Sequence, residues 1–173
     1  MNNRNQSEDR RIGYYWEERF SEILIQFGLS SDKSTPWDAD LEVWDIYGSP
    51  FKAQVRHKEP FRWSDIGLCY GYERYRIDKD MEEINRGYIS IYVVHDYSHF
   101  GKYSEINRLE DWYAQYIEQL NENIVKEVLG WTYYGGQYLR LPICYWQLTQ
   151  FKPLNDILID LKGRMEYLPE VIK

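Results

Sequence analysis

Disulfide-forming cysteines, long apolar runs and an excess of positive charge are all missing from this chain. The two cysteines, Cys69 and Cys144, provide neither a disulfide framework nor the ligand spacing of a zinc site. No apolar run approaches the length of a membrane-spanning helix, and the polar N-terminus lacks the apolar core of a signal peptide. We therefore expect an intracellular, cytoplasmic protein with buried, reduced cysteines.

The charge balance also excludes a surface that is basic throughout. Lysine and arginine number 21 against 28 aspartates and glutamates, which gives a formal net charge of −7. A local basic groove for nucleic acid is still compatible with this total. Aromatic residues are abundant, at 17% of the 173 residues. This aromatic content excludes a disordered chain, and the length suits one globular domain.

The hydrophobic pattern predicts helices and strands that alternate along the chain. The apolar stripe of residues 13–27 predicts a first helix that Gly28 ends, and residues 29–36 are expected to form a loop. The later elements are expected in this order: strands that include 37–43 and 51–58, a helix over 65–84, a strand over 88–95, a helix over 105–128, a strand over 138–150 and a helix over 155–161. Pro142 places the strand 138–150 nearer an edge.

This order predicts an α/β, three-layer fold with a central mixed β-sheet flanked by helices. We expect residues 1–12 to be a flexible tail and residues 13–173 to be a single domain. The strand pair carries unusual rows of polar side chains. The first strand places three carboxylates on one face, namely Asp38, Asp40 and Glu42. The second strand places three polar groups opposite Ala53, Val55 and His57, namely Gln54, Arg56 and Lys58.

Such rows of charge repel unless a cation or a ligand lies between them. Glu17 adds a carboxylate on the inward stripe of the first helix, where a charged group needs a specific role. The carboxylates, the amide and the cations together thus indicate a site for a divalent ion. Oxygen ligands of this kind suit Mg²⁺ or Mn²⁺.

These residues resemble the PD-(D/E)XK nuclease superfamily. The helix from Gly13 through Glu17 to Gly28 is similar to the first helix of that family. Residues 40–43 resemble the strand that bears the aspartate of the motif, and residues 51–56 resemble the strand that bears its acid-x-Lys element. Residues 70–76 and 89–94 are similar to the helix and core strand that follow. The chain departs from the motif in having Gln54 for the acid and Arg56 for the lysine.

The resemblance implies a restriction-endonuclease-like fold and a metal-dependent endonuclease that hydrolyses DNA phosphodiester bonds. The catalytic residues that it implies are Asp40, Gln54, Arg56, Glu17 and Lys58. Mg²⁺ or Mn²⁺ would be held by Asp40, Gln54, the carbonyl oxygen of Val55 and Glu17. Arg56 can bind a phosphoryl oxygen but stays protonated, so Lys58 is the substitute for the missing lysine. DNA and a second copy of the chain, as a homodimer, are the expected partners.

Basic and aromatic residues around this site fit a DNA-binding rim. The basic residues form two clusters, one of Lys52, Arg56, His57, Lys58 and Arg62, and one of Arg74, Arg76 and Lys79. Contacts of this kind hold phosphates without reading base sequence. The interleaved aromatic residues are expected to stack on bases, and they are Trp63, Tyr70, Tyr72 and Tyr75.

Other interpretations stay open. The carboxylate row is equally a solvated strand face, the basic clusters are equally ordinary surface charge, and Glu17 is equally an ion-pair partner of Arg56 or Arg19. The histidines lack metal-ligand spacing and are expected at the surface or at strand ends, namely His57, His95 and His99. One alternative function is a degenerate nuclease-fold domain that binds nucleic acid or a protein partner without cleavage. Another is an interaction module whose acidic surface meets a basic protein.

Overall fold

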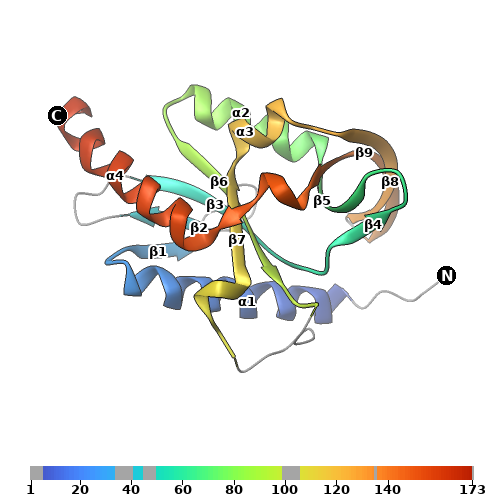
Figure 1. Cartoon of the computed structure of the whole chain (residues 1–173), viewed down its shortest axis with the longest axis horizontal. Coiled ribbons are helices and arrows are strands. Elements are labelled where there is room, and N and C mark those ends of the chain that lie inside the picture. The colour runs from blue at the N-terminus through green and yellow to red at the C-terminus, as the bar shows by residue number, and fades with distance from the viewer. Residues whose placement is uncertain (1–5, 34–40, 45–49, 99–105, 135, 173) are drawn as a thin grey trace.

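The computed structural model describes residues 6–33, 41–44, 50–98, 106–134 and 136–172, which form two β-sheets and their flanking helices (Figure 1). The larger sheet has six strands in the order β1-β2-β3-β6-β7-β10. Its strands are β1 (Ser30–Lys33), β2 (Leu41–Trp44), β3 (Pro50–Lys58), β6 (Ile89–Asp96), β7 (Trp112–Tyr116) and β10 (Lys152–Pro153). Strands β3 and β6 pair in parallel, whereas the other pairs described in this sheet are antiparallel, so the sheet is mixed.

The smaller sheet has four antiparallel strands in the order β4-β5-β9-β8. Its strands are β4 (Phe61–Trp63), β5 (Gly67–Glu73), β8 (Lys126–Tyr134) and β9 (Gln137–Gln147). The α-helices are α1 (Gln6–Gln26), α2 (Arg74–Asn85), α3 (Ile117–Glu122) and α4 (Leu154–Ile172), and two 3₁₀ turns cover Leu109–Asp111 and Leu148–Gln150. In Figure 1, α1 lies below the larger sheet, while α2 and α3 lie above it.

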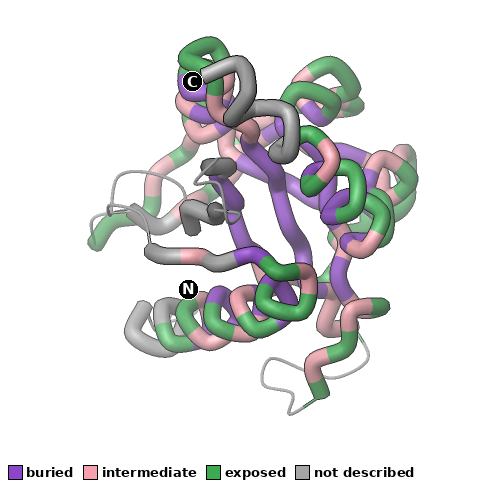
Figure 2. The backbone as a smooth tube through the Cα atoms, turned by 90° about the vertical axis from the view of Figure 1, so that its left-hand side faces the viewer, coloured by how far each residue is buried: buried purple, intermediate pink, exposed green. Residues whose placement is uncertain are grey.

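Two hydrophobic cores lie on opposite faces of the larger sheet. One core joins Trp16 and Phe20 of α1 and Leu158 of α4 to Ala53 and Val55 of β3. The other core joins α2, α3 and the smaller sheet to β6, and its members include Tyr72, Ile77, Tyr92, Val94, Ile117 and Trp146. The buried segments therefore concentrate along the central strands (Figure 2). The expected three-layer α/β fold with a central mixed sheet is confirmed.

Helix α1 follows the predicted apolar stripe but begins at Gln6 rather than at residue 13. Residues 6–12 were expected in a tail, yet they continue the helix, because extending a helix is easier than nucleating one. Its end agrees with the sequence prediction. Gly28 has a φ of +73°, and the amide of Leu29 donates to the carbonyl oxygen of Leu24 at 3.1 Å.

The strand pair that carries the polar rows is present. Leu41 lies opposite Ala53 and Val43 lies opposite Phe51 in the antiparallel ladder of β2 and β3. The expected loop over 29–36 is wrong at residues 30–33, because they form β1 at the sheet edge, where pairing with β2 overrides their polar character. Residues 34–40 and the predicted turn near residues 48–50 lie largely outside the described residues.

The helix predicted over 65–84 is wrong in its first half. Residues 67–73 form β5, and α2 begins only at Arg74. Tyr70 and Tyr72 alternate with Gly71 and pair with β9, where Tyr72 lies opposite Cys144. Short aromatic segments satisfy a helical and a strand period equally well, and here the partner strand decides.

The helix predicted over 105–128 is also largely wrong. Its centre divides into β7 and the short helix α3, and its end belongs to β8. Within β7, the side chains of Trp112, Ala114 and Tyr116 are buried at every second position. This two-residue period identifies a strand, and β6 and β10 on either side satisfy its backbone groups.

Strand β9 is not an edge strand, because it lies between β5 and β8. Pro142 is accommodated because the ladder with β5 ends at Ile143, which leaves Pro142 paired only with Leu129 of β8. The final helix is longer than expected, since α4 extends to Ile172. Both cysteines are free and buried, as predicted. Within the described residues, none of the helices has the length and apolar character needed to span a membrane.

Candidate active site

Strand β3 presents a row of four polar side chains to one face of the larger sheet. Ala53 and Val55 belong to the core under α1, so the alternating side chains of Lys52, Gln54, Arg56 and Lys58 point to the opposite face. Lys52 and Gln54 are buried, while Arg56 and Lys58 are half-buried. Gln54, Arg56 and Lys58 therefore share one face of β3, as strand alternation predicts.

Helix α2 opposes this row with a charged stripe. Glu73 at its N-cap, Arg76, Asp80 and Glu83 follow one another at three- and four-residue steps, which places them on one helix face. The ammonium group of Lys52 lies 3.2 Å from a carboxylate oxygen of Glu83, and both side chains are almost fully buried. The row on β3 thus faces carboxylates that the predicted site did not include.

Arg56 and Lys58 make contacts within the protein at the other end of the row. The Arg56 guanidinium lies 5.7 Å from the centre of the Tyr72 ring, and its Nη1 donates to the carbonyl oxygen of Val55 at 3.3 Å. The Lys58 ammonium donates to the carbonyl oxygen of Gly71 at 2.6 Å. The carbonyl oxygen expected to bind a metal ion is therefore an acceptor for Arg56 in this structure.

The charged stripe shifts the pKa of its carboxylates in opposite directions. Burial raises the pKa of Asp80 to about 7, although the Tyr72 hydroxyl, Arg56 and Arg76 act against this rise. Burial also acts to raise the pKa of Glu73, but Arg76, Arg56 and Lys58 together outweigh it, so the pKa lies below its ordinary value. Separated pKa values in one polar cluster are characteristic of functional sites.

Gln54 occupies the middle of the row, where its side chain is 4% exposed. Its side-chain oxygen Oε1 is buried and has no hydrogen-bond partner among the described residues. A buried acceptor left in this state destabilises a fold by about 1–3 kcal/mol, so it calls for a ligand. A neutral oxygen of this kind is an acceptable ligand for a hard divalent cation.

Glu17 reaches the sheet from the other side. It is buried on α1 beside Trp16, whose indole stacks on the imidazoles of His57 and His95 at ring-centre distances of 4.4 and 3.8 Å. His57 shares the Ala53 and Val55 face of β3, so the structure does not bring Glu17 onto the face that carries Gln54. Arg19, its alternative ion-pair partner, lies 3.7 Å from Glu22.

His57 and His95 lie at the ends of β3 and β6 on the face that contacts Trp16. The Nδ1 atoms of His57 and His95 lie 3.1 Å apart, and His95 is fully buried. Burial and Arg19 lower the pKa of His95 to about 4. His99 lies outside the described residues, as do Asp38 and Asp40. Among the residues that the structure does describe, no three His, Cys, Asp or Glu side chains gather as a metal cluster.

Two of the four residues expected to stack on bases are not accessible. Tyr70 and Tyr72 are buried in the core beneath α2, which corrects their assignment to a DNA-binding rim. Tyr75 is exposed on α2, and Trp63 is half-buried on β4. In the second basic cluster, Arg74 pairs with Glu127 at 2.6 Å.

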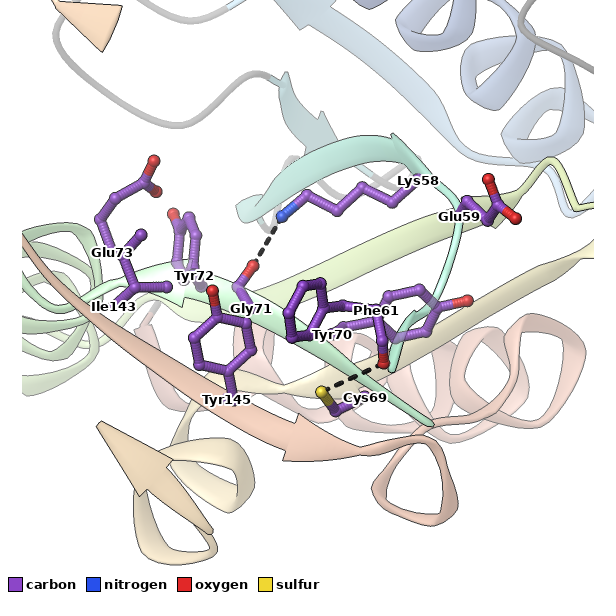
Figure 3. Close-up of a pocket in the computed structure, with 10 residues that line it drawn as sticks. All are labelled: Lys58, Glu59, Phe61, Cys69, Tyr70, Gly71, Tyr72, Glu73, Ile143 and Tyr145. Carbon is purple, nitrogen blue, oxygen red and sulfur yellow. Dashed lines mark hydrogen bonds between the residues drawn. The ribbon is translucent and has the colours of Figure 1, made fainter. Parts of the chain in front are cut away.

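A pocket of about 210 Å³ opens beside Lys58, at the end of the β3 row. Figure 3 shows Lys58 along one side of this pocket, reaching toward Gly71, with Tyr70 and Tyr145 across from it. Its ten lining residues are Lys58, Glu59, Phe61, Cys69, Tyr70, Gly71, Tyr72, Glu73, Ile143 and Tyr145. The polar row therefore leads from the buried Lys52 to a cavity that is open to solvent.

Comparison with known proteins identifies a solved structure with a similar fold. No protein-family model and no curated protein sequence matches this chain. Its structure is similar to that of Hjc, a Holliday junction resolvase from Archaeoglobus fulgidus, with a TM-score of 0.52. The sequences are 7% identical, and the match covers 84% of this chain and 94% of the resolvase chain. The fold is restriction-endonuclease-like.

The expected restriction-endonuclease-like fold is thus confirmed. In the sequence resemblance, β3 corresponds to the strand of the acid-x-Lys element, and its polar face carries Gln54. The unpartnered Gln54 oxygen fits a divalent ion as a ligand, while the nearby guanidinium of Arg56 opposes one.

The acidic members of the site were not predicted from sequence. Glu73 falls inside the helix predicted over 65–84, and its spacing from Arg76, Asp80 and Glu83 is that of one helix face. The signal was present, but the helix start was placed nine residues too early (residue 65 instead of Arg74). That the polar row of β3 faces this charged stripe of α2 becomes apparent only once the fold is known.

Proposed function

We propose that this protein is a metal-dependent endonuclease that hydrolyses DNA phosphodiester bonds. The observation that carries the proposal is Gln54, whose buried side-chain oxygen lacks a partner among the described residues. It stands at the position where the PD-(D/E)XK motif has its metal-binding acid. The similarity to a Holliday junction resolvase supports branched DNA as the substrate class.

The proposed ligands of Mg²⁺ or Mn²⁺ are Asp40, the side-chain oxygen of Gln54 and the carbonyl oxygen of Val55. Glu17 is not among them, because it lies beside Trp16 on the opposite face of the sheet. Asp40 directly precedes Leu41, which pairs with Ala53 beside Gln54. When bound, the ion neutralises charge at the scissile phosphate and acidifies the attacking water.

Arg56 and Lys58 are proposed to act on the substrate phosphate. The Arg56 guanidinium offers paired donors to a phosphoryl oxygen, and it stays protonated throughout. It can do so by exchanging its present contact with the Val55 carbonyl for a contact with the substrate. Lys58 supplies a second positive charge at the mouth of the pocket.

Cleavage assays test the reaction. Supercoiled plasmid, a four-way junction and a matched linear duplex are incubated with Mg²⁺, Mn²⁺ or EDTA. We expect cleavage that requires the metal ion and that Asp40→Ala abolishes, while the exposed α2 variant Glu82→Ala cleaves normally. Cleavage that persists in EDTA, or in Asp40→Ala, would contradict the metal-dependent mechanism. Light scattering with and without DNA tests the homodimer.

Gln54→Glu tests the metal site directly. The added carboxylate is expected to increase Mn²⁺ affinity by roughly 10- to 100-fold, because one charge at contact distance is worth on the order of 1–4 kcal/mol. Titration calorimetry measures the affinity, and thermal unfolding with and without Mn²⁺ measures the accompanying stabilisation.

The matched control is Gln115→Glu, a buried amide on β7 whose Nε2 donates to the Gln150 carbonyl at 2.7 Å. Both variants are expected to lose stability without metal, since each buries a new charge. Only Gln54→Glu should recover it with Mn²⁺. Equal behaviour of the two variants would remove Gln54 from the metal site.

A degenerate nuclease-fold domain that binds DNA without cleaving it is the second candidate. The observation that favours it is the set of internal contacts made by the cations of the row. Lys52 pairs with Glu83, Arg56 donates to Val55, and Lys58 donates to Gly71. Salt-dependent binding without cleavage of any substrate, in either metal, would select this candidate.

A further inference from the structure

We propose that the pocket beside Lys58 binds one unpaired nucleotide of the DNA substrate, with the base stacked on an aromatic cluster. The aromatic cluster consists of Phe61 and Trp63 of β4 and Tyr145 of β9. This inference rests on the proposed function, because it names the part of the substrate that the same site engages. The expected substrate is then DNA that carries single-stranded nucleotides next to the cleaved strand.

The three rings of the aromatic cluster contact one another, with Phe61 exposed and Trp63 and Tyr145 half-buried. Ring centres lie 5.0 Å apart for Phe61 and Trp63, 4.4 Å for Trp63 and Tyr145, and 5.6 Å for Phe61 and Tyr145. Phe61 is 43% exposed, and none of the three belongs to either hydrophobic core. Aromatic rings that are partly exposed and lie outside the cores can stack on bases.

Gly71 leaves space for the aromatic ring of Tyr145 in the pocket wall. A Cβ atom at position 71 would lie 2.6 Å from Cε1 of Tyr145, which is closer than side chains can approach. The Tyr145 ring therefore lies directly against the backbone of β5, and Figure 3 shows it beside Gly71 on the pocket wall. Any larger residue at position 71 would push this ring into the pocket or out of it.

The polar groups of the pocket suit a nucleotide. Lys58 lies along one side and is two residues from Arg56, so a base in the pocket places its phosphate near the β3 row. Glu59 and Glu73 supply carboxylates that accept hydrogen bonds from base amino groups. At the rim, Lys126 lies 4.7 Å from the centre of the Trp63 ring and pairs with Asp65 at 2.9 Å.

The volume of the pocket suits a single base that is not paired. Its volume of about 210 Å³ is below the roughly 300 Å³ of typical small-molecule sites, so it suits one planar ring system. A base inside a duplex is stacked and paired, and releasing it costs free energy that an unpaired base does not require. Flaps, gaps and branch points present such bases, whereas a continuous duplex does not.

Binding assays in EDTA test the inference without any cleavage. Fluorescence anisotropy compares three DNAs that share one duplex: the duplex alone, the duplex with a five-nucleotide single-stranded flap, and the duplex with the same flap built from abasic nucleotides. We expect the natural flap to bind roughly 5- to 100-fold more tightly than the duplex, as expected for one stacked base. The abasic flap keeps the phosphates but should lose this preference.

Variants assign the preference to the pocket. Tyr145→Ala and Phe61→Ala are expected to remove the preference for the flap and to leave duplex affinity unchanged. Phe61→Ala covers the case in which Tyr145→Ala fails to fold, because Phe61 is exposed. The matched control is Tyr138→Ala, an exposed tyrosine on the same strand β9 that does not line the pocket.

The outcomes distinguish a failure of the pocket assignment from a failure of the proposed function. Equal affinity for all three DNAs, or a preference that survives in the abasic flap or in both pocket variants, would overturn the pocket assignment even if cleavage occurs. A flap preference that the pocket variants abolish supports it even if no metal activates cleavage. Failure to bind any of the DNAs in EDTA would overturn the pocket assignment, while the cleavage assays in Mg²⁺ and Mn²⁺ test the proposed function separately.

Discussion

The carboxyl group of Asp80, which is buried between β3 and α2, makes the stability of the protein depend on pH. The side chain is 3% exposed, and burial raises its pKa to about 7, although the Tyr72 hydroxyl donates to it at 3.2 Å. The ordinary value for this group is 3.8. Between these two pH values the folded protein holds a proton that the unfolded chain has released. The free energy of unfolding contributed by Asp80 therefore falls as pH rises from about 4 to about 7.

Asp80→Asn is expected to remove this loss of stability. The amide keeps the shape without a titrating group, so the variant should gain on the wild type by on the order of 1–3 kcal/mol between pH 5 and pH 8. Urea unfolding at several pH values measures the difference, which cancels contributions from other groups such as His95. Asp78→Asn, at an exposed position of the same helix, is the control. Parallel pH profiles of wild type and Asp80→Asn would refute the assignment.

The predictability of the site from sequence differs from residue to residue. Gln54, Arg56 and Lys58 were grouped correctly because strand alternation is a local property that needs no knowledge of the fold. Asp80 was not identified, since its role depends on which element packs against β3. The separation of Glu17 from the Gln54 face also required the fold, because a helical stripe shows which side is inward but not which sheet face it meets.

At the scale of elements, Trp16 is a central contact between α1 and the larger sheet. Trp16 is fully buried, stacks on His57 and His95, and meets Trp112 edge-on at a ring-centre distance of 5.9 Å. Trp16→Ala is expected to lower the free energy of unfolding by about 3–5 kcal/mol, because it leaves a large cavity between the helix and the sheet. Chemical denaturation measures the loss. Tyr14→Ala, at an exposed position of α1, should change stability little, and a similar loss in both variants would contradict this role.

The elements that sequence predicted well share a physical property. The helix over 13–27 and the strands over 51–58 and 88–95 have long, consistent apolar patterns, and the structure contains all three. The helices predicted over 65–84 and 105–128 contain short aromatic segments such as β5 and β7. The spacing of the buried residues in these segments fits both a helical and a strand period. Pairing of β5 with β9 and of β7 with β6 makes them strands. Long-range pairing of this kind is not readable from local sequence.

At the scale of the whole molecule, acids accompany the cations near the candidate site. Lys126 pairs with Asp65, Arg76 with Glu73 and Arg74 with Glu127. This pairing is consistent with the net charge of −7. A protein of this kind releases few counterions on binding DNA, so the logarithm of its affinity should fall with the logarithm of salt concentration with a shallow slope of roughly −2 to −4.

Asp65→Asn tests this balance of charge. The change removes the partner of Lys126 and leaves that ammonium group to bind phosphate beside the Trp63 ring. We expect tighter DNA binding at low salt and a salt slope steeper by about one, because each added phosphate contact releases about one counterion. Anisotropy titrations in EDTA from low to high salt measure both quantities. Asp160→Asn, a similarly exposed carboxylate paired with Arg164 on α4, is the matched control. If the two variants shift the slope equally, DNA responds to the total charge of the protein and not to the surface around the pocket.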